Sequence, residues 1–309
     1  MTILQFMDAF RTEQDCIDYI RDLRLKQGII CKRCNEKTKH YWVKYNNKFQ
    51  CSICRSRTNI KSGTIMEKSK ISIRVWLTAI HFISTIKKSF SALELQKHLG
   101  ISCYETVWYM LHKIRIIMGK RDEKYLLDGD IEIDGGHYEV VNDEFKRGKT
   151  KLKAGQGSQR QAKVLVMVES KPVEHDLKHK KKRVLGYVKM SYVDSFTIKS
   201  INYEVQKSIC KTATVYTDKH KGFNRLSNVV KKHYSEVVKK EDAMKKLPWV
   251  HTIISNSKKM TAGIHHSVNK KYIQNYLNEF CYKLNRRNFK HRDMFDGLAL
   301  ACIEHSWAA

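Results

Sequence analysis

The stretch CKRCNEKTKHYWVKYNNKFQCSIC, residues 31–54, contains four cysteines in two CxxC pairs. Two short aromatic-rich segments flank a polar turn between the pairs, which is typical of a β-hairpin. Two CxxC pairs around a hairpin match a tetrahedral structural zinc site, a zinc ribbon. The predicted ligands are Cys31, Cys34, Cys51 and Cys54. Because so small a module cannot bury a core, we expect zinc to supply about 10–16 kcal/mol of its folding free energy. Four sulfurs leave no open coordination position, so this zinc is structural rather than catalytic.

The chain is strongly basic along its whole length. Its 309 residues include 59 Lys and Arg against 31 Asp and Glu, a formal net charge of +28. So distributed a positive charge favours nucleic acid as the partner, because each cation that neutralises a phosphate releases condensed counterions. We find no signal peptide, long apolar run or amphipathic basic anchor, and therefore expect no membrane partner. Nine cysteines with two CxxC pairs indicate the reducing cytoplasm. We expect a cytoplasmic, nucleoid-associated protein.

Helical patterns flank the ribbon on both sides. Residues 4–26 carry apolar residues at helical spacing and lead directly into the first CxxC pair. After the ribbon, SFSALELQKHLGISCYETVWYMLHKIRIIM (residues 89–118) predicts two helices joined by a short turn. Ser91 and Ser102 are the expected N-caps, and Gly100 takes the left-handed position in the turn. This is a helix-turn-helix pattern of the DNA-binding kind, although a helical hairpin in a core looks similar.

The pattern changes to strands from Asp128 onward. Runs of β-branched residues at 129–141, 162–170 and 183–193 precede an amphipathic helix and a further strand, ATVYTD, at 213–218. This order predicts a mixed α/β sheet with a crossover. Two helices within 269–305 pack back onto it, with Arg286 and Arg287 facing outward.

The fold class is therefore α+β and multi-domain. The expected domains are an N-terminal helix and zinc ribbon (1–62), a helical, helix-turn-helix DNA-binding region (63–122) and a mixed α/β domain with C-terminal helices (123–309).

Two aspartates follow strand patterns directly. Asp134 ends IEID, and Asp218 ends VYTD. Carboxylates at neighbouring strand ends can hold a pair of Mg²⁺ ions, which stabilise the attacking and leaving oxygens of a phosphoryl displacement. Either aspartate alone is as readily explained by a turn or a helix N-cap. Together, on a basic chain with DNA-binding modules, they favour nuclease-like chemistry.

The order of these motifs resembles a known family. The ribbon followed by SGTIMEKSKISIRVW, then IEIDGGHY, YTDKHKGF and WVHTIISNSKK with GIHHSVNKKYIQNYLNEFCYKLNRR, is similar to bacterial insertion-sequence transposases of the zinc-ribbon DDE kind. The resemblance implies an RNase H-like catalytic domain in which Asp134 and Asp218 bind catalytic Mg²⁺ or Mn²⁺. It also implies binding to terminal inverted repeats, strand cleavage, strand transfer into target DNA, and a homo-oligomer on double-stranded DNA.

The third active-site position is open between two residues. Many DDE enzymes have Glu there on a helix with a Lys two turns later, whereas one branch of the family has Asn and Lys. Asn256 with Lys258 fits that branch and is the favoured assignment. His251 is the rival, because it lies seven residues before Lys258 and so shares its helix face. Asn256 does not share a face with His251 on a regular helix.

The resemblance also assigns cations to DNA. Lys258 is expected to place its charge on a scissile or flanking phosphate. The other DNA-binding candidates are Lys259, Arg286 and Arg287. Glu279 is a spare carboxylate that either buttresses the site or faces solvent.

Two rival functions remain. One is a DNA-binding protein or decayed transposase without catalysis, which the missing third carboxylate favours. The other is a nuclease that hydrolyses strands and never joins them.

Overall fold

The computed structural model describes residues 1–141, 155, 158–173, 183–237 and 246–306. The chain forms two compact units, Met1–Arg121 with Asn288–Ala309, and Asp122–Arg287. The first unit combines the regions expected at 1–62 and 63–122. It also includes the last helix, which sequence analysis grouped with the domain at 123–309.

The first unit is built on helices. They are α1 (Ile3–Ala9), α2 (Glu13–Gln27), α3 (Ile73–Thr85), α4 (Ala92–Leu99), α5 (Tyr104–Asp122) and α10 (His291–Glu304). Thr12 and Ser72 cap α2 and α3, because each side chain accepts a hydrogen bond from the third amide of its helix. Phe295 of α10 is fully buried, and its ring contacts those of Phe6 and Tyr19. This aromatic packing explains why α10 belongs to the first unit.

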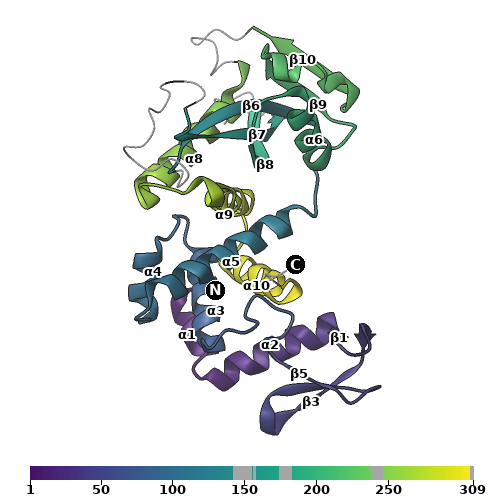
Figure 1. The fold of residues 1–309 in the computed structure, drawn as a ribbon, viewed down its shortest axis with the longest axis vertical. Coiled ribbons are helices and arrows are strands. Elements are labelled where there is room, and N and C mark those ends of the chain that lie inside the picture. The colour runs from purple at the N-terminus through teal and green to yellow at the C-terminus, as the bar shows by residue number, and fades with distance from the viewer. Residues whose placement is uncertain (142–154, 156–157, 174–182, 238–245, 307–309) are drawn as a thin grey trace. The chain divides into compact units, whose positions relative to one another are not determined.

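Helices α4 and α5 form the expected pair (Figure 1). Ser91 caps α4 by accepting a hydrogen bond from the Glu94 amide at 3.1 Å, and Gly100 follows with φ +63°. Both details agree with the sequence-based expectation. The expected Ser102 cap is wrong, because α5 begins only at Tyr104. The Ser102 carbonyl instead accepts a hydrogen bond from Gln96 Nε2 at 2.8 Å, which holds the turn against α4.

The ribbon has two small antiparallel sheets. Strands β1 (Ile29–Cys31) and β2 (Glu36–Thr38) form one. The other contains β3 (His40–Val43), β4 (Lys48–Cys51) and β5 (Arg57–Asn59), with a short 3-10 helix, η1 (Lys44–Asn46), between β3 and β4. The hairpin predicted between the CxxC pairs is β3 and β4.

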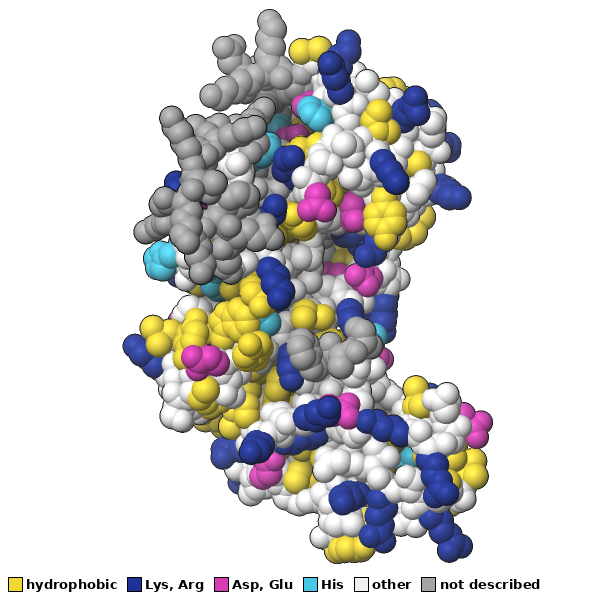
Figure 2. Space-filling view, in the orientation of Figure 1, with side chains coloured by type: hydrophobic (Ala, Val, Ile, Leu, Met, Phe, Trp, Pro, Cys, Tyr) yellow, Lys and Arg dark blue, Asp and Glu magenta, His cyan; other side chains and the backbone are white. Residues whose placement is uncertain are grey.

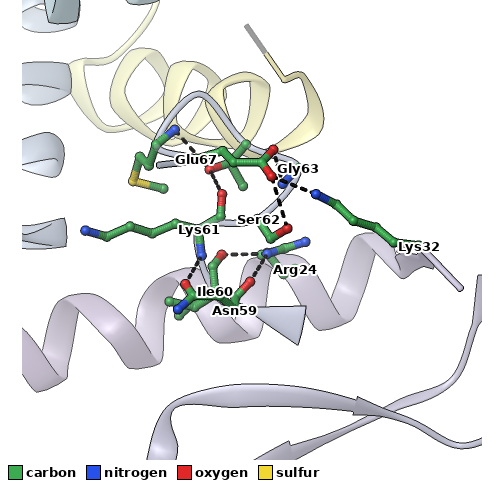
Figure 3. A network of polar contacts seen from close by, with 10 residues as sticks. Arg24, Lys32, Asn59, Ile60, Lys61, Ser62, Gly63 and Glu67 are labelled. Carbon is green, nitrogen blue, oxygen red and sulfur yellow. Dashed lines mark hydrogen bonds and ion pairs between the residues drawn. The ribbon is translucent and has the colours of Figure 1, made fainter. Parts of the chain in front are cut away.

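A polar network holds the ribbon against α2 (Figure 3). The Arg24 guanidinium lies 5.2 Å from the centre of the Phe49 ring and donates to the Ile60 carbonyl at 2.5 Å. Burial lowers the pKa of Arg24 to about 10. Glu67 accepts from Lys32 Nζ at 2.6 Å and from the Gly63 amide at 3.0 Å. These contacts orient one face of the larger ribbon sheet toward the helices.

The second unit is a five-stranded mixed sheet with helices on both faces (Figure 1). Its strands, in the order β10-β9-β6-β7-β8, are β6 (Asp130–Glu139), β7 (Gln161–Pro172), β8 (Arg183–Val193), β9 (Thr214–Asp218) and β10 (Lys232–Glu236). Strands β6, β7 and β8 are antiparallel, whereas β9 is parallel to both β6 and β10. The expected mixed α/β sheet is confirmed.

Two apolar cores lie on opposite faces of this sheet. The crossover helix α6 (Ile198–Ser208) covers one face, and α8 (Pro248–His265) and α9 (Ile273–Asn285) cover the other. The remaining described elements are short 3-10 helices, η2 (Lys221–Phe223), η3 (Leu226–Asn228) and η4 (Lys270–Tyr272). Because β6 is central, its side chains face both layers, and one of those layers contains α8.

Candidate active site

Asp134 and Asp218 lie on adjacent parallel strands at the same level. Ile133 of β6 pairs with Thr217 of β9, so the two aspartates that follow them are neighbours at the carboxyl end of β9. Burial raises the pKa of the Asp134 carboxyl, and the negative charge of Asp218 raises it further. The structure therefore brings together the two carboxylates predicted from the sequence.

Helix α8 runs along β6 above these carboxylates. His251 Nδ1 lies 3.5 Å from Asp134 Oδ2. Further along, the Ser257 hydroxyl is 2.6 Å from the Tyr138 hydroxyl, and Lys258 Nζ is 5.6 Å from the centre of the Tyr138 ring. His251 therefore lies beside Asp134, and Lys258 lies beside Tyr138, further along the same strand. His251 and Lys258 share the helix face directed at β6, as their seven-residue spacing requires.

Asn256 does not share that face. It lies about 140° around the helix from His251, because five residues at 100° each overshoot one turn. Its side chain is exposed to solvent. The structure brings His251 to Asp134, and does not place the favoured candidate, Asn256, there. The reason is the rotation of α8 about its own axis. Contacts between the helix and the sheet determine that rotation.

Glu132 sets the start of α8 against the sheet. Leu247, at the N-cap position, provides no side-chain cap, and Pro248 has no amide hydrogen. Glu132 Oε2 accepts hydrogen bonds from the amides of Trp249 and Val250, each at 2.9 Å. A carboxylate is favoured at a helix N-terminus, both as a hydrogen-bond acceptor and through the helix dipole. Glu132 is only 3% exposed, so this cap lies inside the fold.

Sequence analysis missed Glu132. The available signal was its position two residues before Asp134, because alternate residues of a strand share one face. The partners of that side chain, however, are more than a hundred residues away.

The two glycines of IDGG make room for neighbouring rings. A Cβ at Gly135 would lie 2.7 Å from Phe196 Cζ, and a Cβ at Gly136 would lie 2.8 Å from Tyr138 Cε2. The Phe196 ring also meets the rings of His137 and His220 edge-on, with centroids 5.7 and 6.2 Å away. His137 therefore packs beside Phe196.

His220 is a further site residue that sequence analysis missed. Its amide donates to Asp218 Oδ1 at 3.3 Å. The net rise in the pKa of Asp134, which burial causes, is partly opposed by the Gly135 amide hydrogen bond and, more weakly, by His251 and His220. His220 follows Asp218 by two residues, at the N-cap of η2, and that proximity in sequence was the signal.

The predicted zinc ligands converge on one point. The ligand atoms of Cys31, Cys34, Cys51 and Cys54 all lie within 4.8 Å of one another. The sulfurs of Cys31 and Cys54 are 3.5 Å apart, and those of Cys34 and Cys51 are 3.9 Å apart. A tetrahedron with Zn–S bonds of about 2.3 Å has sulfurs about 3.8 Å apart, so the four thiols fit zinc.

Arg286, expected to face outward, is mostly buried, and that expectation is wrong. Its side chain is 11% exposed, pairs with Asp122 at 2.7 Å, and lies 3.6 Å from the centre of the Tyr282 ring. Arg287 is exposed, and its guanidinium donates to the carbonyls of Gly186 and Leu284 at 3.2 and 3.0 Å.

The remaining charged candidates divide between surface and core. Lys258 and Lys259 are exposed. Glu279 is fully buried and pairs with Lys283 at 2.8 Å, so it is a core residue of α9 and not a solvent-facing carboxylate.

Comparison with known proteins supports the expected class. Residues 126–285 match the family described as ISXO2-like transposase domain, and residues 11–57 match the transposase zinc-ribbon domain. A transposase domain and a transposase ribbon thus stand in the expected order. Because the first match covers more than half of the chain, the protein belongs to the ISXO2-like transposase family.

One relative comes from a transposable element. The chain is 24% identical, over 129 residues, to an uncharacterized protein in transposable element ISH50 of Halobacterium salinarum. The match spans 41% of this chain and 42% of that protein. In the described part of the chain, no helix has the length and apolar character needed to cross a bilayer.

Proposed function

We propose that this protein is the DNA transposase of an insertion sequence. It binds the terminal inverted repeats of its element, cleaves a strand at each end and joins the freed 3′ hydroxyls to target DNA. The observation that carries the proposal is the pairing of Asp134 with Asp218 beneath α8, within the transposase domain. An order of three antiparallel strands followed by two parallel ones supports an RNase H-like fold.

The two carboxylates fit a divalent cation. Asp134 has a raised pKa because it is buried beside another carboxylate, and a bound cation would relieve that repulsion. Hard oxygen ligands suit Mg²⁺ or Mn²⁺. When bound, the ion supplies electrophilic stabilisation of the phosphate oxygens. Asp134 and Asp218 would hold it in place.

His251 and Lys258 complete the site. An imidazole nitrogen suits Mg²⁺ poorly, so His251 orients the Asp134 carboxylate or accepts a proton from the attacking water or 3′ hydroxyl. Lys258, on the same helix face, directs its charge at a DNA phosphate. Lys259 adds a second exposed cation. Asn256 remains the alternative third residue from the family pattern.

The first unit supplies DNA binding. Helices α4 and α5 act as a helix-turn-helix, and the ribbon adds a second contact with the duplex. Because two element ends must be held together, the working form is a homo-oligomer on DNA, in the cytoplasm at the nucleoid.

One observation favours a second candidate, a DNA-binding protein without catalysis. His251 faces Asp134 where many DDE enzymes have Glu, so the site carries one formal negative charge fewer. A metal held by two carboxylates is bound more weakly, and DNA phosphates must complete its coordination.

A strand-transfer assay on pre-cut element ends, with Mg²⁺ or Mn²⁺, tests the proposal. We expect joined products from the wild type and none from Asp134→Asn or Asp218→Asn, with DNA binding retained. Tight binding without any product would support the second candidate. Hydrolysed ends without joining would support a nuclease.

The same assay separates the two candidates for the third residue. We expect His251→Ala to reduce strand transfer by about 100-fold or more and Asn256→Ala by less than about 10-fold, because His251 lies beside Asp134 and Asn256 is exposed on another face of the helix. A larger loss of strand transfer in Asn256→Ala than in His251→Ala would show that Asn256 is the third active-site residue.

A further inference from the structure

The larger ribbon sheet has two different faces. Residues that pair across β3, β4 and β5 point to the same side, and successive residues alternate between sides. Trp42, Phe49 and Thr58 form one row, and Tyr41, Gln50 and Arg57 form the next. The row with Phe49 is covered by Arg24 of α2. The row with Tyr41 lies on the opposite, outer face.

Large aromatic side chains are exposed on this outer face. Tyr41 is 56% exposed, and Tyr45, in the turn between β3 and β4, is 76% exposed. Each lies near a cation, since Lys39 Nζ is 5.4 Å from the centre of the Tyr41 ring and the Arg57 guanidinium is 5.6 Å from that of Tyr45. These rings expose apolar surface to water and do not stabilise the ribbon core. Neighbouring exposed rings of this kind favour a contact surface.

The charge of this region has a single sign. No Asp or Glu occurs between Glu36 and Glu67, and seven Lys or Arg lie in that interval. Figure 2 shows the ribbon end of the first unit with more basic than acidic side chains. Together with Lys48, which shares the outer face with Tyr41, the sheet presents cations and rings with no carboxylate among them.

We propose that this outer face, formed by Lys39, Tyr41, Tyr45, Lys48, Gln50 and Arg57, is the ribbon's docking surface for double-stranded DNA. The cations neutralise phosphates on both sides of a groove, and the tyrosines and Gln50 contact sugars and base edges. Charge complementarity carries the argument, because an acid-free face that combines cations with exposed rings matches a polyanion carrying flat bases. This inference rests on the proposed function only in requiring that the protein bind DNA.

Binding of the full-length, zinc-loaded protein to a labelled duplex of its element end, measured over a series of salt concentrations, tests the surface. Each phosphate contact contributes about 0.9 to the slope of log K against log salt. The triple variant Lys39→Ala, Lys48→Ala, Arg57→Ala should therefore lower the slope by about 3 and weaken binding roughly 100-fold at physiological salt.

Two further variants separate specific contacts from net charge. Replacing Tyr41 and Tyr45 by Ala should weaken binding roughly 10-fold without changing the salt slope, because ring contacts release no counterions. As a matched control, Lys26→Ala, Lys68→Ala, Lys70→Ala removes the same charge from exposed positions of the first unit that lie off the sheet. It should leave the slope unchanged. Zinc content of each variant verifies that the ribbon is folded.

The outcomes are distinguishable. Failure of the wild type to bind any DNA would refute the proposed function and this inference together. Normal binding by the sheet variants, or an equal loss in the control, would overturn the docking surface alone. Tighter binding of single-stranded DNA that depends on Tyr41 and Tyr45 would also overturn it, because the occupant would then be an unpaired strand.

Discussion

Replacing Glu132 tests how the site is assembled. Glu132→Ala removes the carboxylate that accepts hydrogen bonds from the Trp249 and Val250 amides, both at 2.9 Å. A lost N-cap costs about 0.5–2 kcal/mol, and hydrogen bonds to a charged group contribute about 1.5–3 kcal/mol each. Removing a buried carboxylate offsets part of that loss. We expect a net destabilisation of about 2–4 kcal/mol.

The structure also predicts partial rescue by Glu132→Gln. Oε1 of Glu132 has no hydrogen-bond partner among the described residues, so the amide nitrogen of Gln can occupy that position while its oxygen still accepts from both amides. We expect a loss of about 1 kcal/mol, because the bonds lose their charge assistance. The exposed Glu139, on the same strand, provides the control, and Glu139→Ala should change stability by less than about 0.5 kcal/mol.

Two measurements decide this prediction. Urea denaturation gives the change in the free energy of unfolding, and hydrogen exchange of the Trp249 and Val250 amides reports directly on the start of α8. Both amides should exchange faster in Glu132→Ala than in the wild type. Because His251 follows them on the helix, strand transfer should also fall in kcat, with DNA affinity retained. Unchanged exchange and stability would refute the capping role of Glu132.

Three further predictions concern zinc, the buried Arg286–Asp122 ion pair and Gly135 of strand β6. Chelation of zinc should unfold residues 29–59, because zinc supplies the ribbon's folding free energy. New proteolytic cleavage within these residues would report the unfolding, and the unit Asp122–Arg287 should keep its calorimetric melting transition. Arg286→Ala should cost about 3 kcal/mol in denaturant unfolding, because it leaves the buried Asp122 carboxylate without a cation to balance its charge. Unchanged stability with lost DNA binding would return Arg286 to the surface role first expected. Gly135→Ala should cost about 1–3 kcal/mol, because its Cβ would lie 2.7 Å from the Phe196 ring, and Phe196→Leu should recover part of the loss; a neutral Gly135→Ala would show that the ring moves freely.

Much of the site followed from short-range patterns. The four zinc ligands lie in two CxxC pairs around a hairpin, and the structure places their sulfurs together. Asp134 and Asp218 each follow a β-branched run, and neighbouring strands place them side by side. Each of these features depends on a spacing of a few residues, or on the rule that strands end at a common edge.

Other assignments failed because they depend on contacts that the local residue pattern does not show. Arg286 was expected to face outward as a charged residue near a helix end, yet Asp122 draws it into the fold from more than 160 residues away. The Ser102 cap failed over a shorter range, because α5 begins only at Tyr104 and the Ser102 carbonyl bonds to Gln96, six residues earlier. Neither partner was apparent from the local pattern.

The choice between His251 and Asn256 shows most clearly which features follow from local sequence patterns and which require long-range contacts. The sequence predicted that one helix contains both residues and that they lie on different faces, because 3.6 residues per turn separates positions five apart. It also determined the ribbon, the paired aspartates and the family. Which face of α8 meets β6 follows only from the packing of the helix on the sheet. That orientation depends on the Glu132 cap and on the contacts of Ser257 and Lys258 with Tyr138, and these join segments far apart in the chain.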